Sequence, residues 1–244
     1  KTVGYIGLLN QGSTCYMNSA LQCLFHICAF RKIVFSLPTK GDEDITKSVT
    51  LALQRLFVLL QRSEIAPSTS ELTRAFGWTT EDVYIQNDVQ EFMRELIDNI
   101  KTKMKGMENS EAISQLFRGK LLNFVRCLEF EHSTENEEEF YDISLSVKGK
   151  NSLEESLHSF IEDEFLIENE KYYLEDHGYV DAFRGTRFLE LPPVLHIHLK
   201  RFDYDQYYGQ KKMQNRFEFP FELDMEPYIS EKTNDECYKY ELFS

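Results

Sequence analysis

The polar segment Gly7–Ser19 places a cysteine, Cys15, where a helix is expected to begin. Ser13 and Thr14, just before it, are good N-cap residues. Apolar residues then recur at the spacing of one helix face, namely Met17, Leu21, Leu24, Phe25 and Cys28. Unpaired backbone N–H groups and the helix dipole favour the thiolate form of a cysteine at this place, and the thiolate attacks carbonyl carbons. We therefore predict that Cys15 is a nucleophile.

Two neighbours of Cys15 could assist such an attack. Asn10 carries a side-chain N–H₂ that could stabilise an oxyanion together with the backbone amide of Cys15. Gly12 would allow a sharp turn of the backbone before the helix. The alternative is structural, because most cysteines are small buried hydrophobes, and we expect this of Cys23 and Cys28.

Composition narrows the class of protein. The 244 residues are 42% hydrophobic, which is enough for a sizeable core. The formal net charge is −14, from 41 acidic and 27 basic residues. This charge argues against direct binding to nucleic acid and for a basic or neutral partner, although acidity could also serve solubility alone. No apolar run has the length of a membrane span, and the first ten residues lack a signal-peptide pattern. We expect a soluble protein of the nucleus or cytoplasm that binds no membrane.

The cysteines and histidines do not form a pattern typical of metal sites. The five cysteines, at positions 15, 23, 28, 127 and 237, contain no C-x-x-C pair, so neither a disulfide framework nor a zinc site is expected. His196 and His198 alternate on one predicted strand, but they lack a third ligand. We predict no metal and no cofactor.

Hydrophobic periodicity indicates an α+β fold with a helical part, residues 1–112, and a part rich in strands, residues 113–244. Expected helices run from Cys15 to about Arg31, over Val49–Leu60 after an N-cap at Ser48, from Ser70 to Phe76, over Val89–Met104 after Asp88, and after Ser152. Expected strands cover Phe124–Phe130, Tyr141–Val147, Thr186–Leu191, Val194–Phe202 and Phe217–Leu223. The polar stretches His132–Glu139 and Tyr207–Lys212 are expected to be a solvated hairpin tip and a connection.

The cysteine segment resembles the cysteine box of the ubiquitin-specific proteases, N-x-G-x-T-C-Y-x-N-S. The matching residues are Asn10, Gly12, Thr14, Cys15, Tyr16, Asn18 and Ser19. Three later segments resemble family boxes in the same order, namely Gln86–Phe92, Leu195–Phe202 and Asn215–Pro220. Shorter segments look closest to the herpesvirus-associated subgroup, namely Phe76–Trp78, Lys103–Gly106, Phe117–Lys120 and Leu191–Leu195. The resemblance covers nearly the whole chain.

The resemblance implies a single catalytic domain with a papain-like fold shaped like a hand, in which a helical thumb meets a palm and fingers of β-strands. It implies a deubiquitinating thiol hydrolase that cleaves the bond after the C-terminal glycine of ubiquitin, with Cys15 as nucleophile and Asn10 as oxyanion donor. Gln86, Asp88 and Glu91 would line a channel for ubiquitin's basic tail, although Asp88 could also simply cap a helix. The partners would be ubiquitin and ubiquitinated proteins, and we expect a monomer.

Phe202 and Tyr204 resemble residues that pack against the ubiquitin tail, but they could also be ordinary aromatic residues at the end of a strand. Two departures from the family pattern affect the chemistry. The paired cysteines that hold zinc in the fingers of many members are missing, which agrees with the absence of metal expected above. None of the six histidines lies in a segment that resembles the family's glycine-containing histidine box. The box could follow Ser244 in a longer chain, or the protein could have lost it.

His26 could not replace that histidine, because eleven residues of helix separate it from Cys15 by about 16 Å. Two alternatives therefore stay open. One is a catalytically inactive ubiquitin-binding module that keeps the fold and lacks the base. The other is an unrelated thiol acyltransferase or papain-like protease, which would also place a cysteine at the start of a helix.

Overall fold

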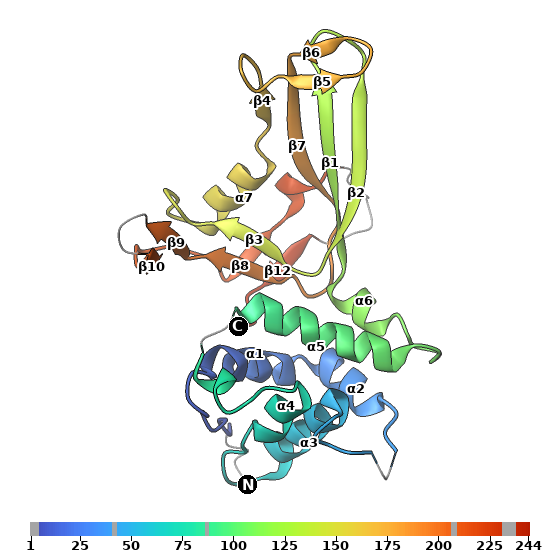
Figure 1. Cartoon of the computed structure of the whole chain (residues 1–244), viewed down its shortest axis with the longest axis vertical. Coiled ribbons are helices and arrows are strands. Elements are labelled where there is room, and N and C mark those ends of the chain that lie inside the picture. The colour runs from blue at the N-terminus through green and yellow to red at the C-terminus, as the bar shows by residue number, and fades with distance from the viewer. Residues whose placement is uncertain (1–4, 41–42, 86–87, 206–208, 231–237) are drawn as a thin grey trace. The chain divides into compact units, whose positions relative to one another are not determined.

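The computed structural model describes residues 5–40, 43–85, 88–205, 209–230 and 238–244. The chain divides into two compact units, Lys1–Leu116 and Phe117–Ser244, and each is described by itself. The first unit is helical (Figure 1). Its helices are α1 (Cys15–His26), α2 (Cys28–Ser36), α3 (Val49–Arg62), α4 (Ser70–Ala75), the 3₁₀ helix η1 (Asp82–Tyr84), α5 (Val89–Met104) and α6 (Ala112–Phe117), which ends on the first residue of the second unit.

Two helices of the first unit begin at the predicted side-chain caps, whereas Thr14 precedes α1 without a capping hydrogen bond from its side chain. The Ser48 hydroxyl accepts a hydrogen bond from the backbone N–H of Leu51, at 3.4 Å, and begins α3. The Asp88 carboxylate accepts one from the N–H of Gln90, at 2.8 Å, and begins α5. Both helices bury one apolar face, so their predicted positions and orientations are confirmed.

The single helix predicted from Cys15 to about Arg31 is wrong, because the chain breaks at Ile27 into α1 and α2. Ile27 has an extended backbone (φ −73°, ψ 101°) and serves as both the C-cap of α1 and the N-cap of α2. The Arg31 guanidinium donates to the carbonyl oxygen of Phe25, at 2.9 Å. A carbonyl at the end of α1 thereby finds a partner, which stabilises the break.

Glu43 connects the loop before α3 to the last turn of α5. Its carboxylate accepts hydrogen bonds from the Lys103 ammonium, at 2.7 Å, and from the Ser48 hydroxyl, at 2.6 Å. These two bonds, with Lys103 contributing most, lower the pKa of Glu43 from 4.5 to about 2. Since the pKa is lower in the folded chain, this carboxylate stabilises the fold above pH 4.5, and the contribution is lost as the pH falls towards 2.

We expect Glu43→Gln to lower the free energy of unfolding at pH 7 by about 1 kcal/mol, the range of a partly screened ion pair. Urea unfolding of both proteins at pH 7 and at pH 3 measures the effect. The difference between wild type and variant should shrink at pH 3, where the wild-type carboxylate contributes less. An equal difference at both pH values would show that the charge of Glu43 is not responsible.

The second unit is built mainly of strands. They are β1 (Gly119–Cys127), β2 (Ser133–Phe140), β3 (Ile143–Ser146), β4 (Glu164–Leu166), β5 (Tyr172–Leu174), β6 (Gly178–Val180), β7 (Ala182–Glu190), β8 (Ile197–Lys200), β9 (Phe202–Asp205), β10 (Gly209–Lys212), β11 (Glu222–Asp224) and β12 (Lys239–Glu241), with α7 (Leu153–Ile161) and the 3₁₀ helix η2 (Glu226–Tyr228). An antiparallel sheet has the order β2-β1-β7-β4, and β3 pairs in parallel with β8. The strands β1, β2 and β7 run side by side as long arms, with β5 and β6 at their far end (Figure 1).

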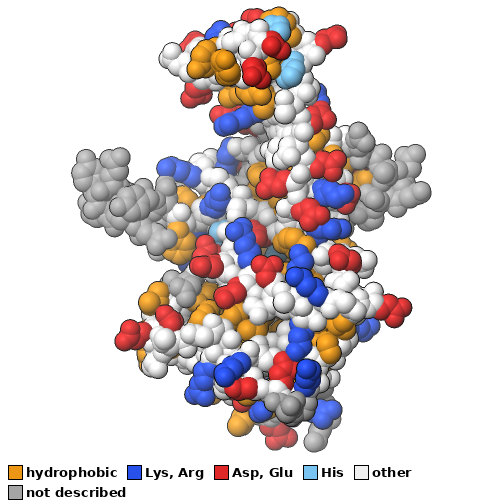
Figure 2. All heavy atoms as spheres, turned by 45° about the vertical axis from the view of Figure 1, so that its right-hand side comes forward, with side chains coloured by type: hydrophobic (Ala, Val, Ile, Leu, Met, Phe, Trp, Pro, Cys, Tyr) orange, Lys and Arg blue, Asp and Glu red, His pale blue; other side chains and the backbone are white. Residues whose placement is uncertain are grey.

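Two connections predicted in this unit are strands instead. The expected hairpin tip His132–Glu139 is mostly β2, which pairs with β1 from Ser133 to Phe140. The prediction failed because β2 is exposed on both faces except at its last residue, so no apolar residues alternate along it. Figure 2 shows acidic and basic side chains intermixed along the long strands. In the expected connection Tyr207–Lys212, residues 209–212 form β10, and residues 207–208 lie outside the described residues.

The predicted strands Phe124–Phe130, Tyr141–Val147 and Thr186–Leu191 overlap β1, β3 and β7 with changed ends, whereas two others differ more. The segment Val194–Phe202 divides at Arg201 into β8 and the start of β9, and Phe217–Leu223 is a strand only from Glu222. The helix predicted after Ser152 is confirmed, because the Ser152 hydroxyl accepts a hydrogen bond from the N–H of Glu155, at 3.3 Å.

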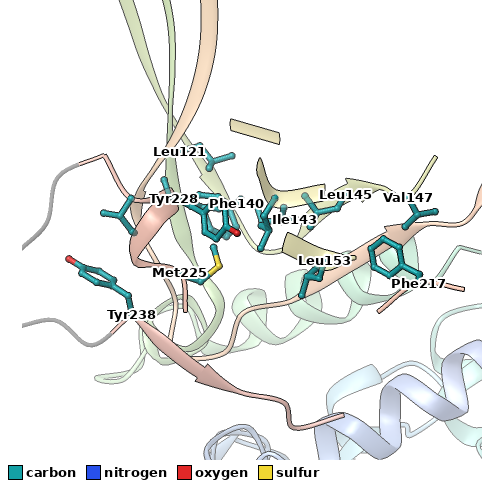
Figure 3. Packing of buried hydrophobic residues seen from close by; sticks show 13 residues of the cluster. Leu121, Phe140, Ile143, Leu145, Val147, Leu153, Phe217, Met225, Tyr228 and Tyr238 are labelled. Atoms are coloured by element: carbon teal, nitrogen blue, oxygen red, sulfur yellow. The ribbon is translucent and has the colours of Figure 1, made fainter. Parts of the chain in front are cut away.

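The core of the second unit lies at the base of the long strands, between α7, β3 and the segment around η2 (Figure 3). Its buried residues come from β1, β2, β3, β7, α7, η2 and the loops beside them, so elements far apart in the sequence pack against one another. Its buried side chains include Leu121, Phe140, Ile143, Leu145, Leu157, Phe188, Met225 and Tyr228. Phe188 holds the base of β7 there, because its ring packs against those of Phe140 and Phe160, with centroids 5.9 and 5.7 Å away.

Candidate active site

Cys15 is the first residue of α1, as predicted, and it is exposed. The helix buries its apolar face, through Met17, Leu21, Leu24 and Phe25. The predicted burial of Cys28 is wrong, because this cysteine begins α2, is exposed, and has the Arg31 guanidinium 3.7 Å from its sulfur. Cys23 is half-buried. The described part of the first unit therefore presents two exposed thiols at helix starts, of which only Cys15 follows the polar loop described next.

The cysteine loop, residues 7–14, is fixed to other parts of the first unit. The backbone N–H of Leu9 donates to the carbonyl oxygen of Pro67, at 3.0 Å, and that of Ser13 donates to the carbonyl oxygen of Val83, at 2.8 Å. The Gln11 side chain donates to the Thr69 hydroxyl, at 2.6 Å. These bonds reach segments more than fifty residues away, so the tertiary fold holds the loop in place.

Gly12 makes the predicted sharp turn. Its φ of +146° lies outside the range that other residues adopt readily. A Cβ at this position would lie 2.7 Å from a ring carbon of Tyr84 and 3.0 Å from the carbonyl oxygen of Val83. The backbone and the close packing of Tyr84 therefore both require glycine here.

Asn10 is exposed and is held by its side-chain oxygen. Its Oδ1 accepts hydrogen bonds from the Thr14 hydroxyl, at 2.9 Å, and from the backbone N–H of Gly12, at 3.3 Å. The other end of the amide is the Nδ2 group, which carries two N–H donors. Asn10 can thus present donors on the side away from its own loop, as an oxyanion donor must.

The start of α5 lies beside the start of α1. The rings of Tyr16, next to Cys15, and Phe92, next to Glu91, meet edge to face with centroids 6.5 Å apart. Glu91, the residue before Phe92, is exposed, and its role towards a ligand at Cys15 stays a prediction. Asp88 is also exposed and acts as the N-cap of α5, so its capping role is confirmed while its role towards a ligand stays a prediction. Gln86 lies outside the described residues.

Sequence reasoning missed Glu95, which follows Glu91 by one turn of α5. Partial burial and the charge of Glu91 raise the pKa of Glu95. Two carboxylates at this spacing repel each other, and a cation placed between them would relieve the repulsion. The spacing i, i+4 from Glu91 was the signal available in the sequence.

Phe202 and Tyr204 lie on β9 in the second unit. The Phe202 side chain is 52% exposed, and the Lys212 ammonium lies 5.8 Å from its ring centroid. Only the backbone of Tyr204 is described. Contact of either residue with a ligand bound at Cys15 stays a prediction.

His26, His196 and His198 each contact residues of their own unit. His26 ends α1, about 16 Å of helix from Cys15, and packs against Tyr5 and Phe25. In the second unit, the His196 ring stacks on Phe117, with centroids 6.1 Å apart, and the His198 Nδ1 lies 3.3 Å from the Ser144 hydroxyl. Among the described residues, no group of three or more histidines, cysteines or acidic residues could hold a metal ion.

Among the described residues, no helix is both long enough and apolar enough to span a bilayer.

An exposed cysteine at the start of a buried helix, with an asparagine amide held just before it, is the arrangement expected of a thiol hydrolase. Comparison with known proteins identifies the family. Residues 6–244 match the family model described as ubiquitin carboxyl-terminal hydrolase. The chain therefore belongs to the ubiquitin carboxyl-terminal hydrolase family.

Proteins with similar sequences occur in Schizosaccharomyces pombe and in Arabidopsis thaliana. Ubiquitin carboxyl-terminal hydrolase 15 of Schizosaccharomyces pombe is 47% identical over 244 residues, which are 99% of this chain and 22% of that protein. Ubiquitin C-terminal hydrolase 12 of Arabidopsis thaliana is 44% identical over 227 residues, which are 93% of this chain and 20% of that protein. The chain thus spans about a fifth of the length of these relatives.

A similar solved structure is that of the SAGA Ubp8/Sgf11/Sus1/Sgf73 DUB module bound to ubiquitin aldehyde. The match has a TM-score of 0.77 and 27% identity, and covers 94% of this chain and 54% of the other. With the family match, this confirms the predicted fold, an α+β papain-like cysteine protease of the ubiquitin-specific protease type.

Proposed function

We propose that this chain carries the nucleophilic site of a deubiquitinating thiol hydrolase, which cleaves the peptide or isopeptide bond after the C-terminal glycine of ubiquitin. The observation that carries the proposal is the pairing of an exposed Cys15 at the start of α1 with an Asn10 amide held by its oxygen. Membership of the ubiquitin carboxyl-terminal hydrolase family supports ubiquitin as the substrate.

In the proposed reaction, the Cys15 thiolate attacks the carbonyl carbon of the terminal glycine. A carbon–sulfur bond forms, and the carbonyl oxygen takes up negative charge, which the Asn10 Nδ2 group and the backbone N–H of Cys15 stabilise. The carbon–nitrogen bond then breaks, and the leaving amine takes a proton from a general acid. Water hydrolyses the thioester and regenerates the thiol.

The acidic residues at the start of α5 suit the basic tail of ubiquitin. Asp88, Glu91 and Glu95 all lie on α5 or at its cap, and Tyr16 and Phe92 connect this helix end to Cys15. In the same proposal, Gln86 hydrogen-bonds the backbone of the tail, and Phe202 and Tyr204 pack against it. The partners would be ubiquitin and its conjugates, bound by a monomer without a metal ion.

Two further parts of the proposal rest on sequence. The segments Phe76–Trp78, Lys103–Gly106, Phe117–Lys120 and Leu191–Leu195 support a place near the herpesvirus-associated subgroup. The absence of any C-x-x-C pair supports reduced cysteines and a location in the nucleus or cytoplasm. Free thiols at Cys15, Cys23, Cys28 and Cys127 agree with this.

A ubiquitin with an electrophile at its C-terminus tests the nucleophile. We expect one ubiquitin adduct per chain by intact mass, no adduct with Cys15→Ala, and normal labelling with Cys28→Ala. The second variant is a matched control, because Cys28 is also exposed at the start of a helix. An adduct that survives Cys15→Ala and disappears with Cys28→Ala would overturn the proposal.

Asp88→Asn separates the two roles of Asp88. Asparagine caps a helix about as well as aspartate but has no charge, whereas Asp88→Ala also removes a cap worth about 1 kcal/mol. We expect Asp88→Asn to keep the thermal stability of the wild type, to weaken ubiquitin binding and to reduce its salt dependence, as measured by calorimetry. If only Asp88→Ala weakens binding, and only in proportion to its lower stability, Asp88 is a cap alone.

A further inference from the structure

Thr14 is the buried residue between the proposed oxyanion donor and the nucleophile. We propose that Thr14 is a positioning residue, whose hydroxyl orients the Asn10 amide so that its Nδ2 group faces the substrate. The inference rests on the proposed function, because it assigns Asn10 the oxyanion. Thr14 itself touches only its own loop and helix in the contacts described below.

The direction of each hydrogen bond follows from the chemistry of the atoms. The backbone N–H of Gln11 can only donate, and it donates to the Thr14 Oγ1, at 3.2 Å. The Thr14 hydroxyl hydrogen is then directed to the Asn10 Oδ1, 2.9 Å away. The backbone N–H of Gly12 can also only donate, and it reaches the same Oδ1 at 3.3 Å.

These bonds exclude the opposite orientation of the Asn10 amide. If the amide were rotated by half a turn, the N–H₂ group would face the N–H of Gly12, which has no acceptor to offer. The Gly12 contact would then set donor against donor, and the Thr14 hydroxyl, which could still accept, would lose the amide oxygen as the acceptor for its own hydrogen. The two bonds therefore select the orientation in which Nδ2 points away from the loop.

Burial makes Thr14 suited to this role. Thr14 is 1% exposed, whereas Asn10 is exposed, so the fixed partner lies inside the protein and the oriented group lies on its surface. The Thr14 carbonyl also accepts from the backbone N–H of Asn18, at 3.0 Å, in the first turn of α1. A branched side chain held in this way has few rotamers, so the hydroxyl keeps its direction.

Orientation of the donor before the reaction is what gives an oxyanion site its catalytic effect. An exposed asparagine without the Thr14 bond would populate several rotamers, and only some of them would present Nδ2 to the substrate. Loss of this orientation would weaken stabilisation of the negative charge on the carbonyl oxygen in the transition state, and it would not change the binding of ubiquitin. Thr14 should therefore affect kcat and leave KM unchanged.

Thr14→Val removes the hydroxyl and keeps the branched shape, and Thr14→Ser keeps the hydroxyl. Both are made in the longest chain that the gene encodes, and cleavage of a ubiquitin–fluorophore conjugate is measured. We expect Thr14→Val to lower kcat by roughly tenfold or more, within the limit of about 10²- to 10³-fold for losing the donor outright. KM should be unchanged, and Thr14→Ser should restore kcat to near the wild-type value. If thermal unfolding shows that the Thr14→Val variant does not fold, Thr14→Ala is measured in its place, with the same expected results.

A double-mutant cycle separates this role from a general effect on the loop, since Thr14→Val also removes the acceptor for Gln11. If Thr14 acts through Asn10, Thr14→Val should add no further loss in an Asn10→Ala background. The inference is overturned if Thr14→Val lowers kcat by the same factor in both backgrounds, if it has no effect, or if Thr14→Ser is equally slow. If the proposed function itself is wrong, Cys15→Ala or Asn10→Ala would leave cleavage unchanged. That result would also contradict the proposed role of Thr14.

Discussion

Replacement of Asn10 by aspartate is expected to slow the cleavage of a ubiquitin–fluorophore conjugate by about 10²- to 10³-fold, the usual effect of losing one oxyanion donor. Aspartate keeps an oxygen that can accept from Thr14 and Gly12, so the cysteine loop should remain in place. The N–H₂ group is replaced by a second oxygen, which has no proton to donate and carries negative charge towards a developing anion. Thermal unfolding should be close to that of the wild type.

Asn10→Ala is the control for the added charge, because it removes the donor without adding a carboxylate. We expect both variants to lose turnover to a similar extent and to keep their affinity for ubiquitin, measured by calorimetry with Cys15 also replaced by alanine. Full activity of either variant would remove Asn10 from the oxyanion site. Slow turnover of the aspartate variant alone would show that its charge, and not the lost donor, is the cause.

The second large effect concerns the general base. We expect residues 1–244 to bind ubiquitin and to react slowly with a ubiquitin electrophile, but to turn over a ubiquitin–fluorophore conjugate poorly. His26 is at the far end of α1 from Cys15. The sequence also predicts that none of the histidines within residues 1–244 belongs to the family's histidine box. A longer form that carries such a box should be faster by about 10²- to 10⁴-fold, the range of general acid–base catalysis.

Both forms are measured under multiple turnover, with Cys15→Ala as the background for each. Equal rates would mean that a histidine within residues 1–244 serves as the base. A longer form that binds ubiquitin without cleaving it would favour the alternative of an inactive ubiquitin-binding module. Slow labelling of the short form agrees with the prediction, because the start of a helix alone favours some thiolate.

Local rules predicted much of the fold. The helices after Ser48, Asp88 and Ser152 begin where a side-chain oxygen caps the first turn, and such caps can be seen in a short stretch of sequence. The break at Ile27 could not be predicted in this way. It is stabilised by the bond from Arg31 to Phe25, and the same apolar pattern would suit one continuous helix.

In the candidate site too, the residue types could be predicted from the sequence, whereas the contacts that position them could not. Cys15, Asn10 and Gly12 could be found from the types and spacing of neighbouring residues, and the structure gives each a geometry suited to its predicted role. The contacts that hold them in place link residues far apart in sequence, such as Gln11 with Thr69. A pattern within one segment contains no information about such contacts. Glu95 could have been found from its i, i+4 spacing to Glu91, whereas the burial of Thr14 and its bond to Asn10 became known only with the structure.

The exposed strand β2 has a consequence for how copies of this protein meet in solution. Four of its eight residues are glutamate, and among the described strands only β1 pairs with it, which leaves its other edge open. An open edge invites a strand from a second copy, and the end product of such pairing is aggregation. Antiparallel pairing of two β2 strands would bring their glutamates together across the new edge, where like charges repel. The glutamate-rich composition of β2, which is typical of a loop, thus protects this exposed strand from pairing with a second copy.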